Sequence, residues 1–184
     1  MHTTYPGSTV EATALCRGSS RQLFDGVFAT GGITLSQVSI MTGLEPYQIQ
    51  NWVKRGFVSS PQRRLYSRAQ FARIAIINML RESLQLEKIC GLIRLIDETS
   101  QSDGEASIRD EELYHRYVDM LAENSINLSD AQSIVNAATK ASLESGLVSL
   151  SAQRRMVTVL QIMFCAHAAS DLRLSAETLL VSLE

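Results

Sequence analysis

Amide and basic side chains gather between residues 47 and 68, where they are suited to binding a polyanion. The segment 46–57, PYQIQNWVKRGF, has apolar residues at every third or fourth position, which is the spacing of one buried helical face. Its amides and bases would then lie on the opposite face. Amides pair with adenine edges, and basic side chains with guanine or phosphate, so this face could read double-stranded nucleic acid. The alternative is an ordinary amphipathic helix with a solvated polar face.

Reactive and metal-binding residue types occur elsewhere, but their spacing matches no familiar chemistry. Cys90, Cys165 and His167 fit no zinc-binding spacing, so we expect the two cysteines to be small buried groups. His115 is expected at the surface, and the acidic run 110–112 favours a helix start. The sequence contains no Gly-rich phosphate loop and no nucleophile elbow. We therefore expect no enzyme activity, no metal site and no cofactor.

The two halves of the chain carry opposite charge. Residues 33–94 hold nine bases and three acids, a net charge of +6, whereas residues 95–184 hold six bases and fourteen acids, a net charge of −8. A basic segment beside an acidic one suggests that only the first meets a polyanion. Solvated faces that merely differ in sign are the alternative.

Composition limits the class of protein. A chain of 184 residues, 45% of them hydrophobic and few of them aromatic, favours a mostly helical protein with one ordinary domain or two small ones. The most apolar run, 157–169, is shorter than the roughly 20 residues that cross a membrane. No basic-then-apolar leader opens the chain, and its three cysteines are far apart. We expect a cytoplasmic protein that does not enter a membrane.

A pair of short helices is predicted to position the polar face. Thr34 and Gln37 fit a capping box, which begins a first helix that ends at Gly43. Pro46 suits the first turn of a second helix, which ends at Gly56. The inward positions of this second helix are Ile49, Trp52 and Val53.

The next segment is predicted to form a short basic wing and two more helices. Residues 57–66 are broken by Pro and Ser, but 63–66 could be extended. Ser67 and Gln70 form a second capping box that begins a helix through Leu84, and another helix is expected at 86–98.

Changes in composition suggest four parts. Residues 1–32 are expected to be a flexible tail in which Leu23, Phe24 and Phe28 could form a short docking helix. Residues 33–98 form the basic unit, and 99–107 a polar linker. The last part, 108–184, is expected to be all helix. Its helices are predicted at 108–125, at 129–145 behind a third capping box (129–132), at 151–169 and at 175–183.

Several segments resemble a known family. The stretches ITLSQVSIMTGL (33–44), YQIQNW (47–52), RGF (55–57), RLY (64–66) and LRESLQLEKI (80–89) are similar, in order and nearly in register, to the MerR-type winged helix-turn-helix. The similarity covers residues 33 to about 98. More narrowly, the chain resembles an uncharacterised bacterial branch with a shortened wing and a helical C-terminal domain. The resemblance implies an all-α fold, in which a MerR-like winged helix-turn-helix domain is followed by a helical bundle.

The resemblance also implies which residues meet DNA. Positions that face the major groove match Tyr47, Gln48, Gln50 and Asn51, and wing positions that reach phosphates and the minor-groove edge match Arg63, Arg64 and Tyr66. The other expected phosphate contacts are Lys54, Arg55 and Arg68. Tyr47 stands where the family usually has a basic residue, and the wing lacks the Asn-Gly pair of a tight hairpin. We therefore expect a short wing, with base readout through amides.

Together these features predict a sequence-specific, DNA-binding transcriptional regulator. Its partner would be double-stranded DNA, and the helices after residue 107 would form a homodimer, since one small motif usually needs a second half-site. The same helices could sense a small-molecule or protein effector. Three alternatives remain: an adaptor whose helix-turn-helix no longer binds DNA, an excisionase-like architectural protein, and a closed monomeric bundle after residue 107.

Overall fold

The computed structural model describes residues 3–102, 109–123, 126–128, 130–147 and 149–182, with side chains described outside 95–102. This part of the chain contains eight helices and two small antiparallel strand pairs, which confirms the prediction of a mainly helical protein. The strands are β1 (Thr3–Thr4), β2 (Glu11–Ala12), β3 (Ile33–Thr34) and β4 (Leu65–Tyr66). The helices are α1 (Ser19–Val27), α2 (Leu35–Thr42), α3 (Pro46–Lys54), α4 (Arg68–Leu80), α5 (Leu86–Ser102), α6 (Asp110–Ala122), α7 (Ala131–Glu144) and α8 (Leu150–Val181).

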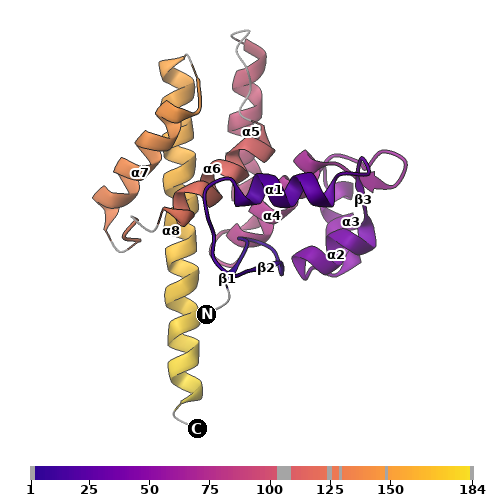
Figure 1. Cartoon of the computed structure of the whole chain (residues 1–184), viewed down its shortest axis with the longest axis horizontal. Helices are drawn as coiled ribbons and strands as arrows, with labels where there is room; N and C mark the ends of the chain where they lie inside the picture. Colours follow the sequence, from indigo (N-terminus) through magenta and orange to yellow (C-terminus); the bar gives the residue numbers. More distant parts are fainter. Residues whose placement is uncertain (1–2, 103–108, 124–125, 129, 148, 183–184) are drawn as a thin grey trace.

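Helix α4 lies at the centre of the molecule. It packs against α2, α5, α6 and α8 (Figure 1). Most of its side chains are buried, including Phe71, Ile74, Ile77 and Leu80. A helix that is apolar on nearly all sides is stable only when other elements surround it. Residues 67–70 begin α4 with the predicted capping box, and residues 34–37 do the same for α2.

An aromatic cluster joins α1, α4 and α6 into one core. The ring of Phe24 in α1 is fully buried, with its centroid 5.5 Å from that of Phe71 in α4 and 5.6 Å from that of Tyr114 in α6. Helix α6 therefore packs on the first half of the chain. Helix α5 also covers residues 99–102 of the predicted linker, and residues 103–108 lie outside the described part.

The N-terminal residues form a clamp on α2, where a flexible tail was expected. Strands β1 and β2 pair, and Tyr5 is buried. Thr9 donates its N–H to the Met41 carbonyl at 2.8 Å and its hydroxyl to the Ile40 carbonyl at 2.7 Å. These bonds satisfy carbonyls that would be unpaired at the end of α2. The prediction of a tail is wrong because the partners of these residues lie far along the chain.

A glycine and an amide complete the clamp. A Cβ atom on Gly7 would lie 1.9 Å from the Ala75 carbonyl oxygen, so only glycine fits this crossing over α4. Asn78 in α4 donates to the Gly7 carbonyl at 3.0 Å and to the Thr42 carbonyl at 2.9 Å. The clamp thus fixes the position of α2 relative to α4.

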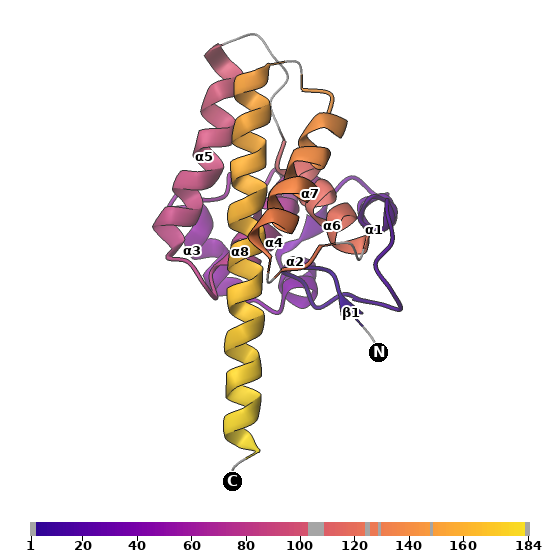
Figure 2. The same cartoon turned by 90° about the vertical axis from the view of Figure 1, so that its left-hand side faces the viewer.

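Two predicted boundaries in the second half of the chain differ from the structure. Asp130 caps α7 by accepting from the Gln132 and Ser133 N–H groups, while residue 129 of the predicted capping box lies outside the described part. Helix α8 is continuous across the break expected between 169 and 175, because residues 170–174 contain neither Gly nor Pro. Its C-terminal half projects beyond the other helices (Figure 2).

Two features are absent from the described residues. None of the described helices is both long enough and apolar enough for a membrane span. Among the same residues, no group of three His, Cys, Asp or Glu side chains is placed to hold a metal ion. Cys90 is buried as expected, whereas Cys165 is exposed on α8.

His115 is buried, although the sequence suggested a surface position. Its side chain is 3% exposed, because α1 covers this face of α6. The Nδ1 atom lies 2.8 Å from the Ser20 hydroxyl oxygen, and Nε2 lies 3.6 Å from a Glu111 carboxylate oxygen. Burial, with the nearby charge of Arg21, lowers the pKa of His115 below its ordinary value of 6.5. Ser20 is also fully buried, so this pair is closed to a substrate.

The depressed pKa of His115 predicts acid sensitivity. As the pH falls, His115 binds a proton in the unfolded chain before it does so in the folded protein. The free energy of unfolding is therefore at its full value above pH 6.5, the pKa in the unfolded chain, and decreases as the pH falls toward the lower pKa of the folded protein. The free energy of unfolding should therefore decrease between pH 7.5 and 5.5, by at most about 1.4 kcal/mol per pH unit. Urea denaturation across this range measures the slope. A His115→Gln variant cannot take up the proton and should show a flatter profile; an unchanged slope would contradict the assignment.

Candidate nucleic-acid interface

Helix α3 is held by its apolar side and by its first turn. Ile49 is fully buried and Trp52 is 5% exposed, so they anchor α3 in the core. Gly43 has φ 69°, which lets the chain turn sharply between α2 and α3. Helices α2 and α3 pack against each other directly after this turn. The predicted helix pair is therefore present, with the expected residues inward.

The opposite side of α3 presents the predicted amide and basic residues. Tyr47 is 67% exposed, and Gln50, Asn51 and Lys54 are exposed as well. Residues three, four and seven positions apart lie on one helical face, so these four side chains form a continuous polar surface. We call these four residues the α3 face.

Two other predicted contacts on this helix have structural roles. The Gln48 side-chain oxygen accepts from the Glu45 N–H at 3.0 Å and so caps the helix. Arg55 donates to Glu87 at 2.5 Å, and its guanidinium carbon lies 4.5 Å from the centroid of the Phe57 ring. Both side chains remain partly exposed, but neither is unpaired.

A tight hairpin stands where the short wing was predicted. Strand β4 pairs with β3, with Tyr66 opposite Ile33 and Leu65 opposite Thr34. The Leu65 N–H donates to the Gln62 carbonyl at 2.8 Å, which closes a two-residue turn. Arg63 and Arg64 form this turn, which we call the arginine tip.

The arginine tip has an unfavourable backbone. Arg63 has φ 50° and Arg64 has φ 66°, the two positive values of a type I′ turn. Asn and Gly favour this turn, whereas other residues lose roughly 1–2 kcal/mol each in the left-handed region. In the described part of the chain neither arginine has an acidic partner, and both are exposed. Strain of this kind is often found at functional sites.

Two other predicted contacts are not available on this surface. Tyr66 is 3% exposed and belongs to the core, because its strand position points inward when Leu65 points outward. Burial also raises the pKa of Tyr66. Arg68 donates to Asp25 at 2.7 Å and lies 3.6 Å from Glu111, so its charge is balanced by carboxylates of the protein itself. The prediction that Tyr66 contacts DNA is therefore wrong.

The structure adds one residue that the sequence analysis missed. Ile40 in α2 is 72% exposed, although it is apolar. A signal was present, since the inward positions of this helix leave Ile40 off the buried face.

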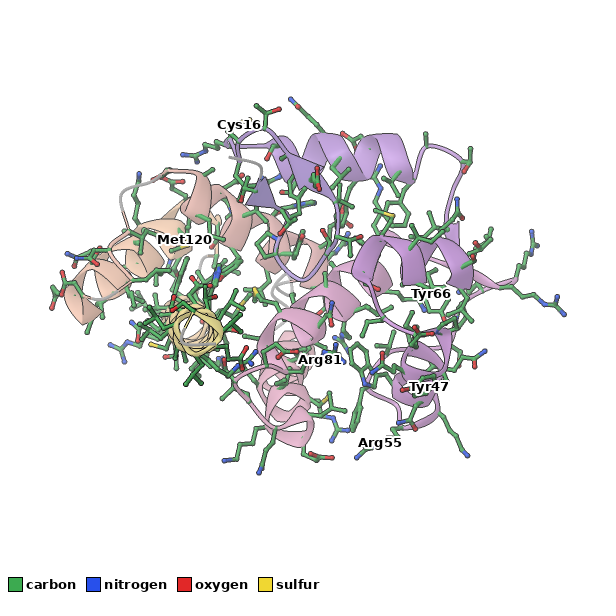
Figure 3. All side chains as sticks on the ribbon, turned by 90° about the horizontal axis from the view of Figure 1, so that it is seen from below. Cys16, Tyr47, Arg55, Tyr66, Arg81 and Met120 are labelled. Atoms are coloured by element: carbon green, nitrogen blue, oxygen red, sulfur yellow. The ribbon has the colours of Figure 1, made fainter. Side chains whose placement is uncertain are left out.

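The predicted site is thus reduced to one end of the molecule. Figure 1 shows α2, α3 and β3 together at this end, with α7 and α8 at the other. In Figure 3 the labelled Tyr47 and Arg55 lie away from Met120 of α6. Part of the positive charge of residues 33–94 is neutralised internally, since Arg68 and Arg73 pair with acids outside that segment. Among the predicted contact residues that the structure describes, the cations without an acidic partner are Lys54, Arg63 and Arg64.

Relief of the strain at the arginine tip should stabilise the protein. Replacing Arg63 by Asn and Arg64 by Gly supplies the residues that a type I′ turn favours, so the free energy of unfolding should rise by about 1–3 kcal/mol. The Arg63→Ala/Arg64→Ala variant is the matched control, because it removes the same charges but keeps side chains at positive φ. Chemical denaturation compares the two. Equal stabilities would show that the turn stores no strain.

Comparison with known proteins finds one family model that is similar to part of the chain. Residues 31–117 match a family model described as a domain of unknown function, DUF1836. The matched span runs from just before β3 to α6 and includes the α3 face and the arginine tip. No curated protein and no solved structure shows significant similarity to the chain.

Proposed function

We propose that the chain is a DNA-binding transcriptional regulator whose residues 33–98 form a MerR-like winged helix-turn-helix. One observation carries the proposal: an exposed helix face of amides and a lysine lies at the same end of the molecule as two unpaired arginines on a strained turn. Amides give base readout and unpaired cations bind phosphate. The three free cysteines accord with a protein of the cytoplasm.

In this proposal α3 lies in the major groove of double-stranded DNA. Gln50 and Asn51 pair with base edges, and Lys54 contacts a phosphate. The arginine tip reaches the neighbouring backbone or the edge of the minor groove. A groove of about 530 Å³ beside the tip is lined by Ser60, Gln62 and Arg63, among others, and offers further polar groups.

The number of free cations sets the expected salt dependence. Lys54 and the arginine tip neutralise about three phosphates per chain, so log K should fall with log salt at a slope of roughly −3 per bound chain. Gln48 caps α3, and Arg55 and Arg68 form ion pairs within the protein. In this proposal these three residues hold the α3 face and the arginine tip in position.

A second candidate is a protein-interaction adaptor that does not bind DNA. The exposed aliphatic side chain of Ile40 and the exposed aromatic ring of Tyr47 favour it, because aromatic residues are enriched in protein contacts. The two functions differ in their response to salt. An adaptor would show no salt-sensitive retention on heparin or random duplex DNA.

Two substitutions should distinguish phosphate contacts, which position the protein on DNA, from the contacts that read bases. Arg64→Ala removes a phosphate contact, so affinity for every duplex should fall and the salt slope should lessen by about 1. Asn51→Ala removes an amide readout worth about 1–3 kcal/mol, so the preference between a selected and a random site should flatten. Fluorescence anisotropy on duplexes selected from a random pool measures both. Arg154→Ala, an exposed arginine on α8, is the matched control.

We further propose a homodimer formed through the projecting half of α8. Leu172, Leu174, Leu179, Leu180 and Val181 are each at least 60% exposed there. Leu172, Ala176 and Leu179 follow the four-and-three spacing of a helix that packs on another helix. A second copy would cover this stripe and supply the second DNA half-site.

The dimer proposal predicts a change of molecular mass. Leu172→Lys/Leu179→Lys places two charges on the stripe, so the protein should become a monomer and lose affinity for a two-fold symmetric site. Light scattering after gel filtration measures the mass. Thr178→Lys adds a charge beside the stripe and should leave the dimer intact. A monomeric wild-type protein would overturn the proposal.

A further inference from the structure

A groove between α6 and α7 has the size and charge of a small-ligand site. It encloses about 380 Å³, within the range of small-molecule pockets. Its apolar lining includes Met120, Ile126 and Ala137, and Ser133 and Asn136 add neutral polar groups. Figure 2 shows α6 and α7 side by side, next to α1.

A guanidinium of the chain itself bridges two carboxylates of this groove. Arg17, which lines the groove from the loop before α1, donates to Glu123 at 3.2 Å and to Glu144 at 2.5 Å. Its side chain is 55% exposed, so these ion pairs are weak and the arginine can leave at little cost. The site between Glu123 and Glu144 therefore already accommodates an organic cation.

The surroundings favour positive charge at this position. Glu123 follows the last residue of α6 and Glu144 is the last residue of α7, where the helix dipoles add partial negative charge. The groove is lined by three basic and four acidic residues, so its net charge is −2 once Arg17 is removed.

The described residues that line the groove offer an anion no unpaired cation. Arg116 donates to Glu112 at 2.7 Å and to the Glu144 carbonyl at 2.9 Å. Lys140 donates to Glu123 at 2.9 Å. Both cations are thus engaged by groups of the groove and its rim. When Arg17 moves away, Glu123 keeps Lys140 at 2.9 Å and Glu144 keeps Arg116 at 3.9 Å, but each carboxylate loses one of its two cationic partners.

We propose that this groove binds a small organic cation, in which a guanidinium or primary ammonium group replaces Arg17 between Glu123 and Glu144. A short carbon chain lies on Met120 and Ala137. Arg17 is then the internal competitor of the ligand.

The position of Arg17 connects the groove to the opposite end of the molecule. Gly18 follows it and donates its N–H to Asp119 at 2.7 Å, and α1 begins at the next residue. Farther along α1, Asp25 accepts from Arg68, the first residue of α4, which lies two positions after β4. The cation would act as an effector of DNA binding, and this consequence alone rests on the proposed function.

Calorimetric titration of the full chain with agmatine, which carries a guanidinium and an ammonium group, tests the site without DNA. Agmatine should bind wild type, and Arg17→Gln should tighten binding about two- to five-fold, since it removes the competitor. Glu123→Gln/Glu144→Gln should weaken binding at least ten-fold. Arg154→Gln is the control for loss of an exposed arginine and should leave affinity unchanged.

Two further measurements are titration with the dianion glutarate, which should bind more weakly than agmatine, and titration of the Arg17→Gln variant. Arg17 is exposed, so its variant reports on the site even if the double acidic variant does not fold. Failure of agmatine to bind both wild type and Arg17→Gln, weaker binding by Arg17→Gln, or tighter binding of glutarate than of agmatine would each overturn the proposal. If the protein binds agmatine but does not bind DNA, only the proposed regulator function is refuted.

Discussion

The contact on which the rest of the structure depends is the packing of Phe24 between α4 and α6. Its ring meets Phe28, Phe71, Tyr114 and His115, with centroids 4.8 to 5.6 Å apart. Removal of this ring from water joins segments that are far apart in the sequence. Helix α4 in turn carries α2, so the α3 face is positioned from the centre of the molecule outward.

Local signals explain which features could be predicted from the sequence. Capping boxes, the glycine after α2 and the apolar spacing of α3 act over a few residues, so both helices of the pair and their inward residues were expected. Tyr66 and His115 were misplaced because their burial depends on residues from distant segments. Arg63 and Arg64 were expected in a short wing, but their tight turn could not be foreseen, since a type I′ turn disfavours these residues.

Some of the opposite charges in the two halves of the chain form ion pairs with each other within the protein. Arg73 pairs with Asp110 at 2.8 Å and Arg68 with Asp25, so part of the asymmetry holds α4 against α6 and α1. The unpaired cations can bind an external anion without first breaking an ion pair. The net charge counted from the sequence is therefore larger than the charge of the exposed basic surface. The difference comes from bases such as Arg68 and Arg73, which form ion pairs within the protein.

The clamp also imposes an order on folding during synthesis. The Pro6 carbonyl accepts from the Tyr114 hydroxyl across 108 residues, and the Gly18 N–H donates to Asp119 across 101. Pro6 and Gly18 therefore lack these native partners during synthesis until α6 has left the ribosome. Because such contacts close long loops, the N-terminal segment joins the core late and the chain should fold slowly for a helical protein.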